Sequence, residues 1–124
     1  QLLQLDDSHS SVETTNNKLK TATHHMLNLE KDKFFIEISN ALTSYLKRKL
    51  QLPESAVDRN EMIKYLTDYG VSMQVVEHYS QISKICDMAK FAGVYENMEE
   101  TIQKTENLIQ EIEKHAALTT FEHQ

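Results

Sequence analysis

Only two glycines and one proline occur among the 124 residues, and this scarcity restricts the fold more than any other feature of the sequence. Hairpins and tight turns depend on these two residue types, so an all-β design is disfavoured. Hydrophobic residues make up 40% of the chain and charged residues 26%, which is ordinary for a globular protein. We therefore predict an all-α fold, a compact bundle of four to five short helices whose pairs can stack as in helical repeat proteins.

The length fits one domain with one hydrophobic core. Residues 1–13 are polar, with scattered leucines and no sustained period, and predict a flexible tail or linker. We assign 14–118 to a single helical domain and 119–124 to a frayed C-terminus.

Apolar residues at three- and four-residue steps predict the first two helices. A helix near 15–29 is indicated by one such stripe, formed by Leu19, Ala22, Met26 and Leu29. The strongest stripe runs from Phe34 to Leu50, with Asp32 as its predicted N-cap. It stops at Leu52-Pro53, because the residue before proline is pushed out of the α region.

Local signals at helix ends predict three further helices. Asp58 and Glu61 have the spacing of a capping box, and Gly70 follows at a position suited to a left-handed residue. Ser72 is the predicted cap of the next helix, which ends near Gly93. Asn97, with Glu100 three residues on, precedes a long acidic helix that we expect to run to about Leu118.

The charge distribution excludes some classes of partner. The formal net charge is −6, and from Glu96 onward there are seven acidic residues and two lysines. Binding to a phosphate backbone needs clustered cations, so we expect no nucleic-acid partner. No apolar run reaches the roughly 20 residues that cross a bilayer, so we expect no membrane span in these residues. The start at Gln1 suggests a piece of a longer protein, with room for a missing membrane anchor.

Residues with catalytic or metal-binding potential lack the spacing that such chemistry needs. No histidine stands four residues from another, and His24 and His25 are adjacent, so they point about 100° apart on a helix. Glu111 and His115 share a helical face and could hold a metal weakly, but a solvated pair is the favoured interpretation.

Cys86, the single cysteine, lies in an apolar stripe as a buried small hydrophobe and fits a reducing, cytoplasmic compartment. With two distant glycines the chain has no phosphate-binding loop, so we predict neither enzyme activity nor a cofactor.

The only basic cluster is formed by Lys47, Arg48 and Lys49 at the end of the strongest stripe. Cations there favour the negative end of the helix dipole, which is a structural role. The alternative is contact with an acidic partner or with acidic lipid headgroups.

Three blocks of the sequence resemble the C-terminal region of BatD, the Bacteroides aerotolerance family. In Phe34 to Ser55 (FFIEISNALTSYLKRKLQLPES) the residues in register are Ala41, Leu42, Tyr45, Leu46, Lys49, Leu50, Leu52, Pro53 and Ser55. The segment Asn60 to Val71 is similar to the family's short helix ending in Gly-Val, and Ile85 to Ala92 (ICDMAKFA) is similar to its C-E-x-A-R-Y-A segment. Phe35, Asp87, Lys90 and Phe91 depart from the usual Tyr, Glu, Arg and Tyr, and Gly93 stands where proline is common.

The resemblance implies a parent with extracytoplasmic β-sandwich domains, one transmembrane helix and this domain on the cytoplasmic side of the inner membrane. It implies a protein-interaction role in an envelope complex linked to oxidative stress tolerance. A MoxR-type AAA+ ATPase and von Willebrand A-type proteins are the candidate partners, since their genes are neighbours in this family's operons. The polar positions that coincide with family motifs are Asp87, Lys90 and the basic end at Lys47, Arg48 and Lys49, and we predict that these residues contact the partner. A free-standing helical adaptor, or a metal- or ligand-binding bundle, are the alternatives.

Overall fold

The structure is a computed structural model that describes the backbone of residues 2–53, 55 and 58–122, and the side chains of residues 13–115 within these ranges. It contains five helices, which are α1 (Leu2–Leu27), α2 (Lys31–Lys49), α3 (Arg59–Tyr69), α4 (Met73–Ala92) and α5 (Met98–Glu122). No strand occurs among the described residues, so the predicted all-α fold is confirmed. No helix within the described ranges is long and apolar enough to span a membrane.

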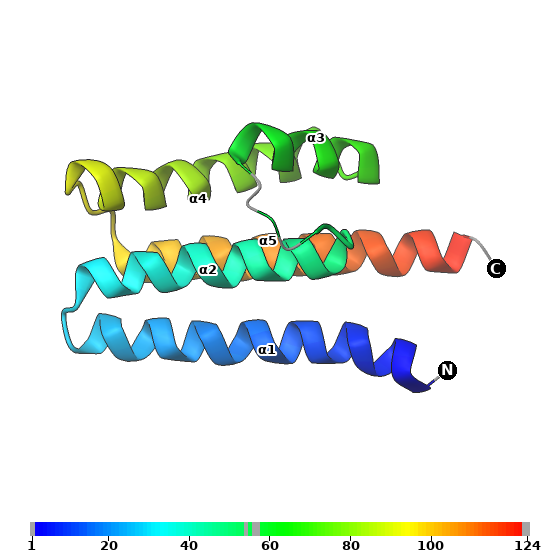
Figure 1. Cartoon of the computed structure of the whole chain (residues 1–124), viewed down its shortest axis with the longest axis horizontal. Coiled ribbons are helices and arrows are strands. Elements are labelled where there is room, and N and C mark those ends of the chain that lie inside the picture. The colour runs from blue at the N-terminus through cyan, green and yellow to red at the C-terminus, as the bar shows by residue number, and fades with distance from the viewer. Residues whose placement is uncertain (1, 54, 56–57, 123–124) are drawn as a thin grey trace.

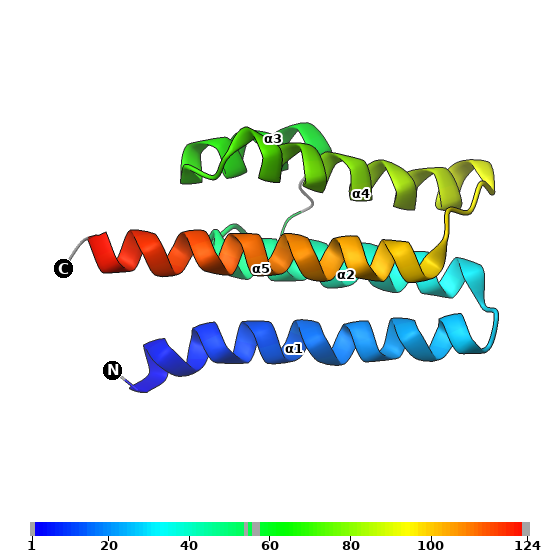
Figure 2. The same ribbon diagram turned by 180° about the vertical axis from the view of Figure 1, so that it is seen from behind.

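The helices form three layers (Figure 1). α1 forms one outer layer, α2 and α5 lie side by side in the middle, and α3 and α4 form the other outer layer, as the reverse view also shows (Figure 2). α2 contacts α1, α4 and α5, whereas α1 makes no contact with α3 or α4 in the described part of the chain. The strongest stripe of the sequence therefore belongs to the central helix.

The buried face of α2 explains its central place. Its predicted stripe is buried at seven positions, namely Phe34, Phe35, Ile38, Ala41, Leu42, Tyr45 and Leu46. Burying each large side chain contributes roughly 1.5–3 kcal/mol, so this helix supplies a large share of the core's stability. Phe34 and Phe35 also pack edge to face, with ring centroids 4.8 Å apart.

Three predicted helix starts are confirmed. Asp58 accepts a hydrogen bond from the Glu61 backbone N–H at 2.8 Å, and the Glu61 carboxylate accepts one in return from the Asp58 N–H. Ser72 accepts from the Val75 N–H at 3.3 Å, and Asn97 from the Glu100 N–H at 2.9 Å. Each cap satisfies a backbone donor that the first turn leaves without an intrahelical partner.

Two helix ends use a left-handed residue that is not glycine. Leu29 has φ 59° after α1 and Gln51 has φ 56° after α2. In both turns the next residue donates back to the residue five positions earlier, from Glu30 N–H to the His25 carbonyl and from Leu52 N–H to the Lys47 carbonyl, each at 2.8 Å. This is the Schellman motif, in which glycine is the usual left-handed residue, as Gly70 is after α3 with φ 97°.

Several predicted boundaries are wrong. The first helix begins at Leu2, not near residue 15, so the backbone of 2–13 is helical where a tail was predicted. The last helix runs past Leu118 to Glu122, and the remainder of the predicted frayed end lies outside the described residues. Asp32 is not the N-cap of α2, because Glu30 holds that position and α2 starts at Lys31. Leu29 is 76% exposed, since it lies beyond the end of α1 and not on its buried face.

Candidate functional site

A groove of about 450 Å³ lies between the first half of α2, the second half of α4 and the α4–α5 connection. We call it the α2–α4 groove. Its buried lining residues are Phe35, Cys86 and Ala89, and its more accessible lining residues are Asp32, Ile36, Ser39, Asn40, Asp87, Lys90, Gly93 and Tyr95. The volume falls within the range of about 300–1,000 Å³ that is typical of ligand pockets.

Tyr95 holds one end of the groove in place. Its hydroxyl donates a hydrogen bond to Asp32 in the first turn of α2, and this bond raises the pKa of the Tyr95 phenol. Its ring stacks on Phe35 with centroids 6.0 Å apart, and the Lys31 ammonium lies 5.4 Å from the ring centroid. The α4–α5 connection is thereby fixed against α2, which gives the groove a defined end wall.

Arg59 contacts a lining residue of the groove, Asp87, from the start of α3. Its guanidinium donates to Ser83 Oγ at 3.0 Å and forms a salt bridge with Asp87, so the start of α3 is tied to α4. Asp87, a predicted partner contact, lines the groove, and its negative charge is neutralised by Arg59. The Asp87 side chain remains 49% exposed, so it is accessible but electrostatically compensated.

Lys90, the other predicted contact on α4, lies in the same groove and is exposed. Its ammonium is 5.2 Å from the centroid of the Phe91 ring, an arrangement typical of a cation–π contact. Asp87 and Lys90 are therefore brought together at one surface.

The basic cluster lies at the opposite end of α2 and is engaged within the fold. Lys49 Nζ is 2.7 Å from Glu113 Oε2 and its side chain is only 10% exposed. The same carboxylate accepts a hydrogen bond from the buried Tyr45 hydroxyl, and burial together with this bond raises the pKa of Tyr45. Arg48 donates to Thr14 Oγ1 at 3.3 Å. The structure thus separates Lys47, Arg48 and Lys49 from Asp87 and Lys90.

The histidines whose side chains the structure describes lie beside polar groups of other side chains or of the backbone. Glu111 Oε1 lies 2.9 Å from His78 Nδ1, and His115 Nε2 lies 3.4 Å from the Tyr69 carbonyl oxygen. His25 Nδ1 lies 2.9 Å from Glu30 Oε1. In the part of the chain that the structure describes, no three His, Cys, Asp or Glu side chains are grouped so that they could hold a metal ion.

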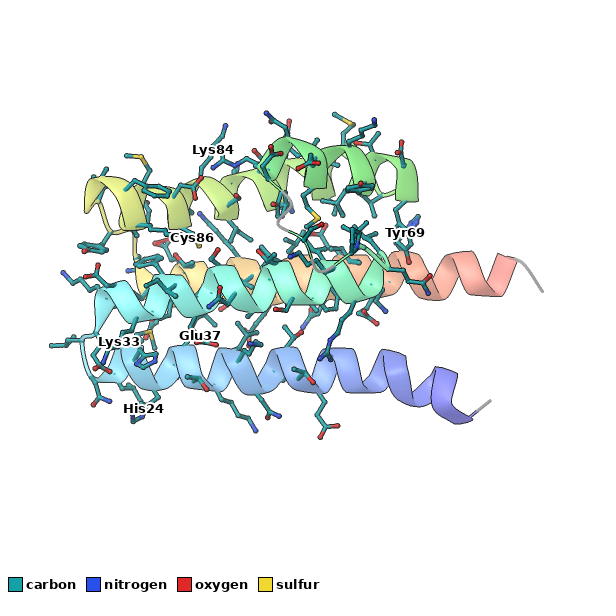
Figure 3. All side chains as sticks on the ribbon, in the orientation of Figure 1. His24, Lys33, Glu37, Tyr69, Lys84 and Cys86 are labelled. Atoms are coloured by element: carbon teal, nitrogen blue, oxygen red, sulfur yellow. The ribbon has the colours of Figure 1, made fainter. Side chains whose placement is uncertain are left out.

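Cys86 lines the groove but is nearly buried, with 5% of its surface exposed. In Figure 3 it points from α4 toward the layer of α2 and α5, whereas Lys84 on the same helix points away from the bundle. Burial, and secondarily the charge of Asp87, raises the pKa of the thiol to about 12. A thiol with so high a pKa is a poor nucleophile near neutral pH.

Exposed apolar residues gather around the groove, and sequence analysis did not identify them. Of nine large exposed hydrophobic residues in the described ranges, five line the groove or are immediate sequence neighbours of a lining residue: Ile36, Met88, Phe91, Val94 and Tyr95. The available signal was that Ile36 falls outside the buried stripe of α2, and that Val94 and Tyr95 are apolar residues in a connection between helices.

Comparisons with known proteins add no assignment. A scan against protein-family models, a search of curated proteins and a search of solved structures find no match to this chain.

Proposed function

We propose that the chain is a non-catalytic protein-interaction domain and that the α2–α4 groove is its contact surface. The observation that carries this proposal is the combination, in one groove of about 450 Å³, of a half-exposed Ile36, an exposed Lys90 and a buried apolar lining. Exposed apolar side chains that cluster beside polar ones are typical of surfaces that bind other proteins.

The parent protein and its partners are proposed from sequence resemblance. We propose a membrane-anchored BatD-like protein of the aerotolerance and oxidative-stress type, with this domain on the cytoplasmic side of the inner membrane. A MoxR-type AAA+ ATPase and von Willebrand A-type proteins are the first partners to test. Two of the positions that coincide with family motifs, Asp87 and Lys90, lie in the groove, and this supports the groove over the basic end of α2.

The test is affinity capture from a native lysate, read by mass spectrometry, together with direct binding of the two purified candidate partners. Ile36→Ser removes an apolar lining residue, and Met73→Ser is its control, because Met73 is 70% exposed at the opposite end of α4 from the groove. Lys90→Glu reverses the charge in the groove, and Lys84→Glu is the control on the outward side of the same helix.

We expect Ile36→Ser and Lys90→Glu each to reduce partner recovery about fivefold or more, and both controls to retain it, since altering an anchor residue of an interface costs about 1 kcal/mol or more. Circular dichroism of each variant verifies that it is folded. Equal recovery with all four variants would show that the partner binds elsewhere on the molecule.

A second candidate function, a metal-binding bundle, is carried by Glu111 and His115 on one face of α5. We do not favour it, because Glu111 is paired with His78 and His115 with a backbone carbonyl. Metal analysis of protein purified without a polyhistidine tag tests it, and a stoichiometric, tightly held metal would restore it.

A further inference from the structure

Two polar side chains of the α2–α4 groove have no partner within the described molecule. Ser39 and Asn40 are exposed on α2 and line the groove, and neither side chain forms a hydrogen bond with another described residue. The Asn40 carboxamide carries two donors and an acceptor, the same groups as a peptide bond. It can therefore bond both the N–H and the carbonyl of a single residue in a partner's backbone.

The free hydrogen-bonding groups of Ser39 and Asn40 suit an extended partner segment better than a helical one. A helix satisfies its interior backbone groups by its own hydrogen bonds and offers none to Ser39 and Asn40. An extended segment leaves its backbone N–H and C=O groups without partners of their own, and these must be paired when they are buried. The two side chains on α2 can supply those partners.

The size of the groove sets the length of the segment. From Asp32 to Asn40 the α2 wall rises about 12 Å, at 1.5 Å for each helical residue. An extended chain advances about 3.3 Å per residue, so this length holds about four residues. The buried lining by Phe35, Cys86 and Ala89 has room for an apolar side chain from that segment.

The charges along the groove determine the charge of the segment. Asp87 is compensated by Arg59. Asp32 lies in the first turn of α2, where the helix dipole favours a carboxylate, and accepts a hydrogen bond from Tyr95. Lys90 contacts the Phe91 ring but forms no salt bridge with a described residue, so it is the cation of the groove that has no acidic partner there, just as Asp32 has no basic one. A carboxylate in the partner is the complement of Lys90.

We propose that the α2–α4 groove binds an extended segment of a partner protein, with one aliphatic side chain between α2 and α4, its backbone held by Asn40 and Ser39, and an acidic residue beside Lys90. This inference rests on the proposed function, because it names the chemistry of the partner that the same groove recognises.

The test uses the isotope-labelled chain and two pools of short synthetic peptides. Each peptide has one central leucine, isoleucine or methionine, flanked by glutamate in the first pool and by lysine in the second. Peptides are titrated while the Asn40 side-chain amide and the Gly93 backbone amide are followed by nuclear magnetic resonance. We expect the glutamate pool to bind and to shift both signals.

Variants of peptide and protein then identify the contacts. N-methylation of the central peptide residue, and Asn40→Ala in the protein, should each weaken binding about tenfold, because each removes a hydrogen bond and leaves its partner unpaired. Asn107→Ala, an exposed asparagine on α5, is the control that should bind normally. Lys90→Glu should transfer the preference to the lysine pool, while Lys84→Glu should leave it unchanged.

Three results would overturn the inference: neither pool shifts these signals, the N-methylated peptide binds equally well, or a helix-stapled version binds more tightly than the linear one. Loss of lysate capture with Ile36→Ser but no peptide binding would reject the extended segment and leave the proposed function standing. Full capture with both Ile36→Ser and Lys90→Glu would reject the groove as the contact surface, and with it both proposals.

Discussion

The two ends of α2 use their polar and apolar residues in opposite ways. At the C-terminal end, Lys49 and the buried Tyr45 share the Glu113 carboxylate, so a cluster that is conspicuous in the sequence holds α2 to α5. At the N-terminal end, Ile36 stays half exposed and Lys90 of α4 has no salt bridge with a described residue. A basic cluster that stands out in the sequence can therefore stabilise the fold, whereas Ile36 and Lys90, which do not stand out, remain accessible to a partner.

The largest expected effect lies in the buried stripe that connects these two ends. Leu46→Asp places a charge at a position that is 0% exposed, so we expect a loss of more than about 4 kcal/mol and no cooperative thermal unfolding. Ile36→Asp on the same helix is the control and should cost less than about 1 kcal/mol, because Ile36 is 47% exposed. A cooperative Leu46→Asp variant would mean that the buried face of α2 is misassigned.

The reactivity of Cys86 tests how closed the buried lining of the groove is. A thiol pKa raised from its ordinary 9.0 to about 12 gives a native thiolate fraction about a thousandfold lower near neutral pH. We expect disulfide-exchange reagents to modify the native protein far more slowly than the denatured protein, and the rate to rise with pH toward 12. Equal rates in both states would show that the groove is open to Cys86.

The polar network at the C-terminal end of α2 should contribute less to the free energy of unfolding than the buried core, but more than an exposed charge does. Glu113→Ala leaves Lys49 and the Tyr45 hydroxyl without their shared acceptor, so we expect a loss of about 2 kcal/mol in denaturant unfolding. Glu106→Ala, which removes an exposed carboxylate from the same helix, and Lys90→Ala should each change stability by less than about 0.5 kcal/mol. If Lys90→Ala is as destabilising as Glu113→Ala, the two ends do not differ as described.

A small gain in the free energy of unfolding is expected from substitutions at two helix ends. Leu29 and Gln51 both adopt a left-handed conformation that is costly for residues other than glycine. Leu29→Gly and Gln51→Gly should each raise the free energy of unfolding by about 0.5–1 kcal/mol, measured by denaturant titration. Gly93→Ala, at φ 65°, is the reciprocal variant and should lower it. Destabilisation by Leu29→Gly would mean that the Leu29 side chain packs on something.

The sequence allowed the helical class and the local starts of α3, α4 and α5 to be predicted, because a cap such as Asp58 with Glu61 is recognised within four residues. The start of α1 was missed, since its polar composition argued for a tail while the backbone is helical from Leu2. The groove could not be predicted, because it depends on which part of the α2–α4 contact stays uncovered after α3 and the α4–α5 connection are placed. Arg59, which neutralises Asp87 from another helix, gave no signal in the sequence for the same reason.

Partner capture by two charge-reversal variants distinguishes the two ends of the molecule as contact surfaces. The variants are Lys90→Glu and Arg48→Glu, both at exposed positions. We expect that Lys90→Glu loses the partner that the unaltered chain recovers, and that Arg48→Glu retains it. Loss with Arg48→Glu and retention with Lys90→Glu would place the interface at the basic end and contradict the account.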